Sequence, residues 1–165
     1  MATPTSPMVP TDAAAAATAT TTATPSGATL PEPIRSFLGV TRFATLGTID
    51  PDGRPRQAVI WYRLDGDDII VNSKVGRRWP SNIVRDPRVS VAVTDDTDGY
   101  RWVGLTGTAT VVDDQPTAQA DIAEMARRYH ADEPAKAERL IRDQFQRQRR
   151  ISFRISIDAV HDHFD

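Results

Sequence analysis

The segment Asp50-Pro51-Asp52-Gly53 separates two stretches in which successive side chains alternate in character. These stretches cover residues 42–49 and 57–63, and alternation with a period of two is typical of strands. Proline, aspartate and glycine in this order favour a tight turn. The pattern therefore predicts an antiparallel hairpin. A second turn sequence at 64–68 precedes a short apolar strand at 69–73, which extends the hairpin to three strands.

Further strands and four helices follow from the rest of the pattern. Alternating valines predict a strand at 88–94, and β-rich runs predict strands at 100–112 and 151–157. Helical spacing, prolines and stop signals predict short helices at 33–39, 76–86, 116–129 and 134–145. About six strands in hairpins, without alternating βαβ units, indicate an α+β protein built on an antiparallel barrel.

Composition changes sharply near residue 30. Residues 1–30 are rich in alanine, threonine and proline, and Asp12 is their one charged residue. Such a segment cannot bury enough apolar surface to offset its chain entropy. We therefore expect a disordered arm over 1–30 and a single folded domain over 31–165. No run approaches the length of a membrane span and no secretory signal is evident, so we expect a cytoplasmic protein.

Charge and cysteine content exclude several function classes. Lysine and arginine number 20 against 22 acidic residues, which gives no overall basic field for nucleic acid. The absence of cysteine excludes disulfides, thiolate metal sites and cysteine nucleophiles. Phosphate-loop, serine-elbow and zinc-protease motifs are also absent. We therefore expect no metal site and no nucleic-acid partner, and redox chemistry would require a bound cofactor.

Residues 73–82 concentrate anion-binding groups where a strand ends and a helix begins. A hydroxyl, free amides at a helix start and arginine forks favour phosphate, and Gly76 allows close approach of the backbone. A solvated loop would have the same composition, so both interpretations stay open from composition alone. A second basic stretch, 144–150, is expected to be a solvated helix end, since no aromatic platform accompanies it.

The order of several short motifs resembles the FMN-binding split-barrel superfamily of pyridoxamine 5'-phosphate oxidase-like proteins. Within it, the chain looks most similar to the B branch of flavin/deazaflavin oxidoreductases, which bind the hydride carrier coenzyme F420. The resemblance spans nearly all of residues 35–165. The motifs are ATLGTIDPDGRPR (44–56), IWY (60–62), IVNSK (70–74), NIVRDPRV (82–89) and GLTGTA (104–109).

This resemblance implies a homodimer of six-stranded antiparallel split β-barrels with a cofactor at the subunit interface. It implies that the cofactor ring lies along Val59, Ile60 and Trp61, with Asn72 across from them. The phosphate would be held by the residues that follow the third strand, namely Ser73, Lys74, Arg77 and Arg78. The chain departs from many relatives at Trp79, where they carry a lysine. Trp79 then either stacks on the ring or substrate or is an interface hydrophobe.

The implied activity is an F420-dependent reductase that transfers hydride between the deazaflavin C5 and a conjugated small-molecule substrate. No catalytic base is obligatory, because the cofactor carries the chemistry. Protonation would come from solvent, or from Tyr62 or Tyr100 if either faces the groove. One alternative is an FMN-dependent oxidase or flavin reductase. Another is a non-catalytic protein that stores a cofactor or haem.

Overall fold

The computed structural model describes residues 27–164, which form four α-helices, one short 3₁₀ helix and seven strands. The arm predicted over 1–30 lies outside the described residues, apart from 27–30. No helix among the described residues is long and apolar enough to cross a bilayer. The strands are β1 (Ala44–Ile49), β2 (Pro55–Ile60), β3 (Tyr62–Asp65), β4 (Asp68–Lys74), β5 (Arg88–Thr94), β6 (Trp102–Val112) and β7 (Arg150–His163). The helices are α1 (Glu32–Gly39), α2 (Arg78–Arg85), α3 (Gln115–Tyr129), α4 (Pro134–Asp143) and the 3₁₀ helix η1 (Phe145–Arg147).

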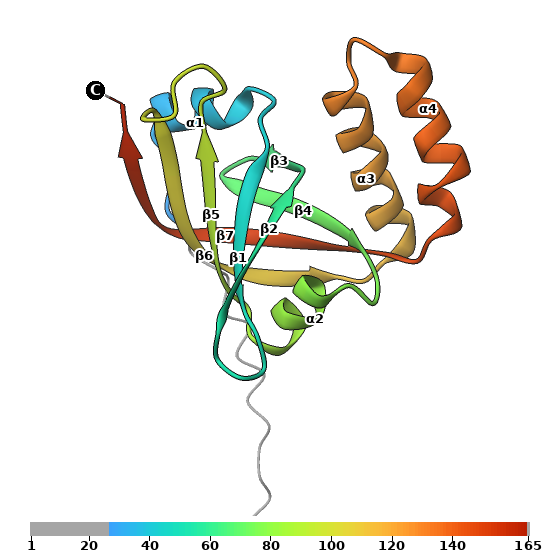
Figure 1. Cartoon of the computed structure of the whole chain (residues 1–165), viewed down its shortest axis with the longest axis horizontal. Coiled ribbons are helices and arrows are strands. Elements are labelled where there is room, and N and C mark those ends of the chain that lie inside the picture. The colour runs from blue at the N-terminus through green and yellow to red at the C-terminus, as the bar shows by residue number, and fades with distance from the viewer. Residues whose placement is uncertain (1–26, 165) are drawn as a thin grey trace, which may run out of the picture.

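All seven strands join one antiparallel sheet in the order β2-β1-β5-β6-β7-β4-β3. The sheet curls on itself, with α2 below it and the α3–α4 hairpin on one side (Figure 1). The two edge strands, β2 and β3, follow one another in the chain and are separated only by Trp61. The fold is therefore a partly open barrel whose two edges are joined by a single residue.

The strand count corrects the six-stranded prediction, because the expected strand at 57–63 is two strands. Ile60 pairs with Ala44 on β1, whereas Tyr62 pairs with Val71 on β4. The chain thus leaves one edge of the sheet and joins the other at Trp61. Side chains alternate without interruption through this point, so periodicity alone does not reveal the break. The α+β class, the antiparallel arrangement and the four predicted helices are confirmed.

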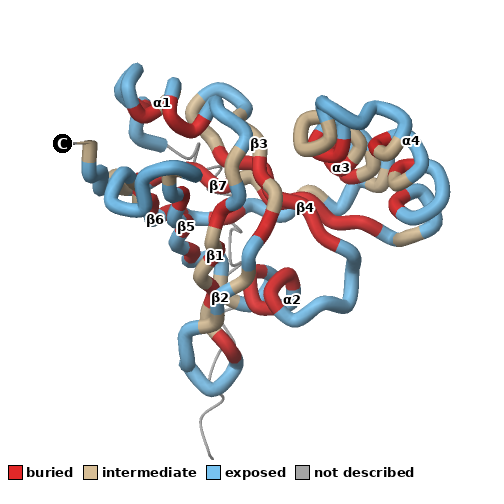
Figure 2. Tube along the Cα trace, turned by 45° about the horizontal axis from the view of Figure 1, so that its top comes forward, coloured by how far each residue is buried: buried red, intermediate tan, exposed pale blue. Residues whose placement is uncertain are grey.

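The core lies inside the curled sheet, on the inward faces of its strands (Figure 2). Strand β5 alternates buried and exposed residues, with Val89, Val91 and Val93 inward, as predicted. Strand β4 differs because both of its faces are covered. Ile69 and Val71 face the barrel core, while Ile70 packs under α3 and α4 in a second apolar cluster. This division determines which β4 side chains reach the functional site.

Gly107 marks a β-bulge where the pairing of β6 with β7 shifts register. A Cβ atom built here would lie 2.4 Å from the Ser156 carbonyl oxygen and 2.9 Å from Ile155 Cγ2. The backbone oxygen cannot move away without disturbing the two longest strands. We therefore expect Gly107→Ala to lower the free energy of unfolding by about 1–3 kcal/mol. Urea titration would measure the change.

Gly99→Ala is the matched control, because a Cβ at Gly99 meets nothing within 4 Å. A Gly107→Ala protein as stable as the Gly99→Ala protein would contradict the close approach at the bulge.

Candidate functional site

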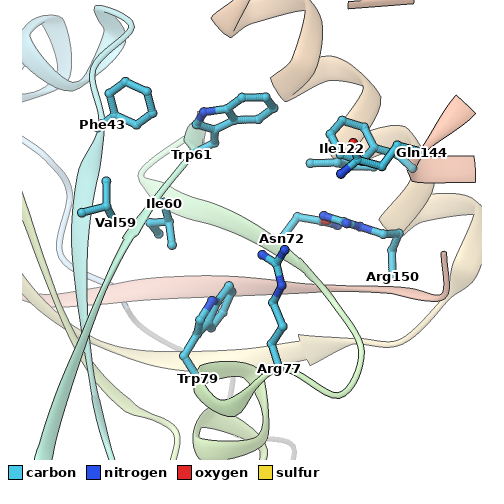
Figure 3. Close-up of a pocket in the computed structure, with 11 residues that line it drawn as sticks. Phe43, Val59, Ile60, Trp61, Asn72, Arg77, Trp79, Ile122, Gln144 and Arg150 are labelled. Atoms are coloured by element: carbon cyan, nitrogen blue, oxygen red, sulfur yellow. The ribbon is translucent and has the colours of Figure 1, made fainter. Parts of the chain in front are cut away.

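A cavity of about 230 Å³ opens beside Trp61, which forms the corner where β2 ends and β3 begins. The cavity lies between the sheet, α2 and the α3–α4 hairpin (Figure 3). One part of its lining is apolar and aromatic, and the other is amide and guanidinium. The lining residues are Phe43, Val59, Ile60, Trp61, Asn72, Arg77, Trp79, Ile122, Gln144, Phe145 and Arg150. The cavity therefore offers an apolar surface next to a cationic one.

Two guanidinium groups provide the positive charge of the cavity. Arg150, at the start of β7, is only 4% exposed, and among residues 27–164 it has no carboxylate partner. Burial, together with the nearby charge of Arg77, lowers the pKa of Arg150 to about 10. The Arg77 side chain precedes α2 and has no hydrogen-bond or ion-pair partner within the same part of the chain. Two cations without a counter-ion favour an anionic ligand between them.

Asn72 on β4 fixes the position of the buried arginine. Its Oδ1 accepts from Arg150 Nε at 2.9 Å and from Nη2 at 2.6 Å. Its Nδ2 donates to the Ala118 carbonyl oxygen at 2.9 Å and to Ser152 Oγ at 2.8 Å. The amide is thus fully used within the protein. Asn72 lines the same cavity as the β2 residues Val59 and Ile60, and there it positions Arg150.

Aromatic side chains form an apolar wall of the cavity. Trp61 lies at the corner between β2 and β3, and Trp79 lies on α2 (Figure 3). The Trp79 ring packs against Phe153 of the core, with 5.8 Å between the ring centroids. At the outer rim, Phe43 is 59% exposed and Val59 is 72% exposed. The wall is therefore firmly held on its inner side and uncovered on its outer side.

Asp50 anchors α2, and with it Trp79 and Arg77. Its buried carboxylate accepts two hydrogen bonds from Arg56 at 2.9 and 3.0 Å and two from Arg78, both at 3.0 Å. Asn82 Nδ2 donates to the same carboxylate at 2.7 Å. Hydrogen bonds from Arg56, Arg78 and Asn82, in that order, hold the pKa of Asp50 well below its usual range. The turn residue thus connects the β1–β2 hairpin to the helix.

This network makes stability depend on pH. The unfolded chain takes up a proton at Asp50 near pH 4, whereas the folded protein resists it, so the free energy of unfolding rises with pH through this range. We expect the stabilisation to be complete above about pH 5 and to decline as pH falls towards 2. Asp50→Asn should lower the Tm at pH 7 and flatten the dependence of Tm on pH between 5 and 3.

Asp52→Asn, in the same turn, is the control, because the Asp52 carboxylate is exposed and its hydrogen bond and ion pair are both with Arg54. Equal pH dependence of Tm in the Asp50→Asn and unaltered proteins would contradict the role of this carboxylate.

The structure brings together most of the residues that the sequence assigned to cofactor binding. The cavity is lined by Val59, Ile60, Trp61, Asn72, Arg77 and Trp79. Ser73, Lys74 and Arg78 do not line it. Ser73 points into the barrel on the other face of β4 from Asn72, Lys74 is exposed at the strand end, and Arg78 is held by Asp50.

Neither candidate tyrosine lines the cavity. Tyr62 is fully buried and donates its hydroxyl hydrogen to the Leu38 carbonyl oxygen at 3.0 Å. Burial raises its pKa. Tyr100 is 81% exposed in the loop between β5 and β6. Neither tyrosine is therefore placed to donate a proton to a ligand in this cavity.

Sequence reasoning missed Phe43, Ile122, Gln144, Phe145 and Arg150, which also line the cavity. The most important of these is Arg150, which the sequence placed in a solvated basic helix end. It lies instead at the buried start of β7. The one available signal was its position directly before the apolar alternation at 151–157, which makes it the first residue of a strand.

Comparison with known proteins extends this description. The family model described as "Pyridoxamine 5'-phosphate oxidase" matches residues 30–164. No curated protein matches the chain in sequence.

Solved structures share its fold at low identity. An F420 reductase is 24% identical with a TM-score of 0.64, covering 80% of this chain and 98% of its own. A conserved hypothetical protein from Mycobacterium tuberculosis is 24% identical with a TM-score of 0.68, covering 83% of this chain and 86% of its own. HutZ, the haem storage protein from Vibrio cholerae, is 21% identical with a TM-score of 0.62, covering 79% of this chain and 93% of its own.

Proposed function

Because the chain belongs to the pyridoxamine 5'-phosphate oxidase family, we propose that its cavity binds a flavin-type cofactor and that this cofactor is coenzyme F420. The protein would then be an F420-dependent reductase of a conjugated small molecule. The single observation that carries the proposal is that Arg77 and Arg150 line one cavity together with aromatic side chains, and that within residues 27–164 neither guanidinium has a carboxylate partner. A phosphate and a planar ring joined in one ligand match this arrangement.

The residues have separate tasks in this proposal. Arg77 and Arg150 bind the phosphate, and hydrogen bonds to Asn72 and Gln148 hold the Arg150 guanidinium at the cavity. Ile60 and Trp61 provide the surface along which the ring is oriented. The reduced deazaflavin, when bound, supplies a hydride from its C5 carbon. The protein contributes binding, orientation and the exclusion of water by its apolar wall.

No carboxylate, histidine or tyrosine lines the cavity, as far as residues 27–164 are concerned. The proton that completes the reduction of a C=C or C=N bond would accordingly come from water.

The uncovered rim supports a homodimer as part of the proposal. Val59 pairs with Thr45 on β1, and Thr45 lines a shallow hollow of about 240 Å³ on the outer sheet face. That hollow is lined in part by small residues, including Gly47, Ser90 and Ala92, which allow a second backbone to approach closely. A second copy of the chain on this face would cover Val59 and complete the cavity.

We expect light scattering to give the mass of a dimer for the unaltered protein. The Ala92→Glu variant should give the mass of a monomer, because it places a charged side chain in the hollow.

The test of the proposed activity is equilibrium binding of the purified protein to F420 and to FMN side by side, measured by calorimetry. Micromolar or tighter binding of F420 with much weaker binding of FMN is the expected result. The reverse preference would assign the site to FMN and would refute the F420 reductase. Reduced F420 that binds but transfers no hydride to a panel of enone and imine acceptors would indicate a cofactor carrier.

A further inference from the structure

Tyr129, the last residue of α3, contacts the chain on both sides of the gap in the barrel. Its hydroxyl donates to the Arg42 carbonyl oxygen at 2.6 Å, just before β1. The Tyr129 hydroxyl oxygen in turn accepts a hydrogen bond from the Tyr62 backbone N–H at 3.1 Å, where β3 begins. Burial raises the pKa of Tyr129, so the phenol stays protonated and able to donate at neutral pH. One side chain thus ties the segment before β1 and the start of β3 to the helix.

The ring of Tyr129 also forms part of the surroundings of Trp61. The two rings are stacked, with centroids 4.9 Å apart and planes 14° apart. His130 meets the Trp61 ring edge-on at 5.5 Å, and Phe145 does so at 6.3 Å. Phe43 also packs against Tyr129, with 5.6 Å between their ring centroids. The indole that lines the cavity is therefore held on several sides by aromatic residues from α3, η1 and the connection between α3 and α4.

We propose that Tyr129 is a positioning residue that fixes the Trp61 wall of the cavity. It does not line the cavity itself. Trp61 lies between the last residue paired on β2 and the first paired on β3, so regular sheet pairing does not hold it. The Tyr129 hydroxyl replaces that missing restraint by binding the backbone of Tyr62, directly after Trp61, and that of Arg42, just before β1. The ring then holds the indole plane in one orientation.

The consequence concerns binding of a planar group, and in that respect the inference rests on the proposed function. A ligand that stacks on Trp61 binds tightly only if the indole is already oriented, because ordering it on binding costs affinity. Without the hydroxyl, the Tyr62 N–H loses its partner and the corner gains freedom. Tyr129→Phe is therefore expected to weaken F420 binding about tenfold, because one hydrogen bond is worth about one decade in affinity.

The experiment compares Tyr129→Phe with the unaltered protein, both labelled with 5-fluorotryptophan. The three tryptophans give separate ¹⁹F signals, and Trp61→Phe assigns the signal of Trp61. In Tyr129→Phe, the Trp61 signal should shift and broaden while that of Trp102, on another part of the sheet, stays unchanged. Tyr100→Phe is the matched control, because it removes an exposed phenol and should change neither the Trp61 signal nor F420 affinity.

A double-mutant cycle separates positioning from a general structural effect. If Tyr129 acts through Trp61, adding Tyr129→Phe to Trp61→Phe should cause no further loss of F420 affinity. An additional tenfold loss in the double variant would overturn the proposal, and so would an unchanged Trp61 signal in folded Tyr129→Phe. Unaltered protein that binds neither F420 nor FMN would refute the proposed function instead. The ¹⁹F signal would then decide on Tyr129 by itself.

Should Tyr129→Phe fail to fold, His130→Ala tests the same wall from its other side. This variant removes the edge-on contact with Trp61 and leaves the hydroxyl bonds in place. His130→Ala alone should perturb the Trp61 signal less than the double variant His130→Ala/Phe145→Leu, which also removes the Phe145 ring. Equal, unperturbed Trp61 signals in both would overturn the idea that these aromatic contacts fix the indole.

Discussion

Arg77→Ala is expected to bind F420 about 10- to 100-fold more weakly than the unaltered protein, because a hydrogen bond to a charged group is worth about 1.5–3 kcal/mol. Arg77 is exposed and lines the cavity, and its guanidinium has no hydrogen-bond or ion-pair partner among the described residues. Its removal should therefore change the free energy of unfolding by no more than about 0.5 kcal/mol. Calorimetric titration and urea unfolding of the same preparation would measure both quantities.

Arg54→Ala is the matched control for this change in charge. Arg54 lies in the β1–β2 turn with an 84% exposed side chain and is absent from the cavity lining. We expect its F420 affinity to equal that of the unaltered protein. If both variants bind equally well, the phosphate does not lie at Arg77, and if both weaken equally, the attraction comes from overall charge.

Phe153→Ala is expected to cause the largest loss of stability, about 3–5 kcal/mol in the free energy of unfolding. Phe153 is fully buried near the start of β7, opposite Val71 on β4 and Val111 on β6. Its deletion leaves a cavity that rigid strands on both sides cannot close. The Trp79 ring, which rests on Phe153, loses support at the same time. Urea unfolding followed by circular dichroism would measure the loss.

Val84→Ala provides the comparison, since Val84 is a largely exposed apolar residue on α2. Its free energy of unfolding should lie within about 0.5 kcal/mol of the unaltered value. A Phe153→Ala protein that loses no more stability than Val84→Ala would contradict the position of Phe153 at the centre of the core.

The strands and helices could be predicted because their signals are local. The Asp50 turn, the alternating valines of β5 and the proline-led helices each depend on a few neighbouring residues. The break at Trp61 could not be predicted in this way. It reflects a change of pairing partner from β1 to β4, and the side-chain pattern continues through it. Strand identity at that point is a property of the whole sheet.

The binding residues also divide into those with a local sequence signal and those whose position depends on the tertiary structure. Asn72 and Ser73 are neighbours in the sequence with similar polarity, yet only Asn72 faces α3 and the cavity. Which of the two does so depends on where α3 packs, and no local signal gives that. Arg150 lies 78 residues from its partner Asn72, and its burial depends on β4 and β7 pairing. The motif at 73–82 therefore identified one side of the site, and tertiary structure supplied the other.

The position of β7 in the sheet has a consequence for how the molecule is made. It lies between β6 and β4, so the β3–β4 hairpin has no other strand to pair with in the sheet. During synthesis from the N-terminus, this hairpin waits until the last strand has emerged, which is a contact of long sequence separation and slow to form. Arg150 arrives on that same strand and meets Asn72 only then. Ligand binding would thus serve as a reporter of completed folding, because partly synthesised chains lack half of the cationic pair.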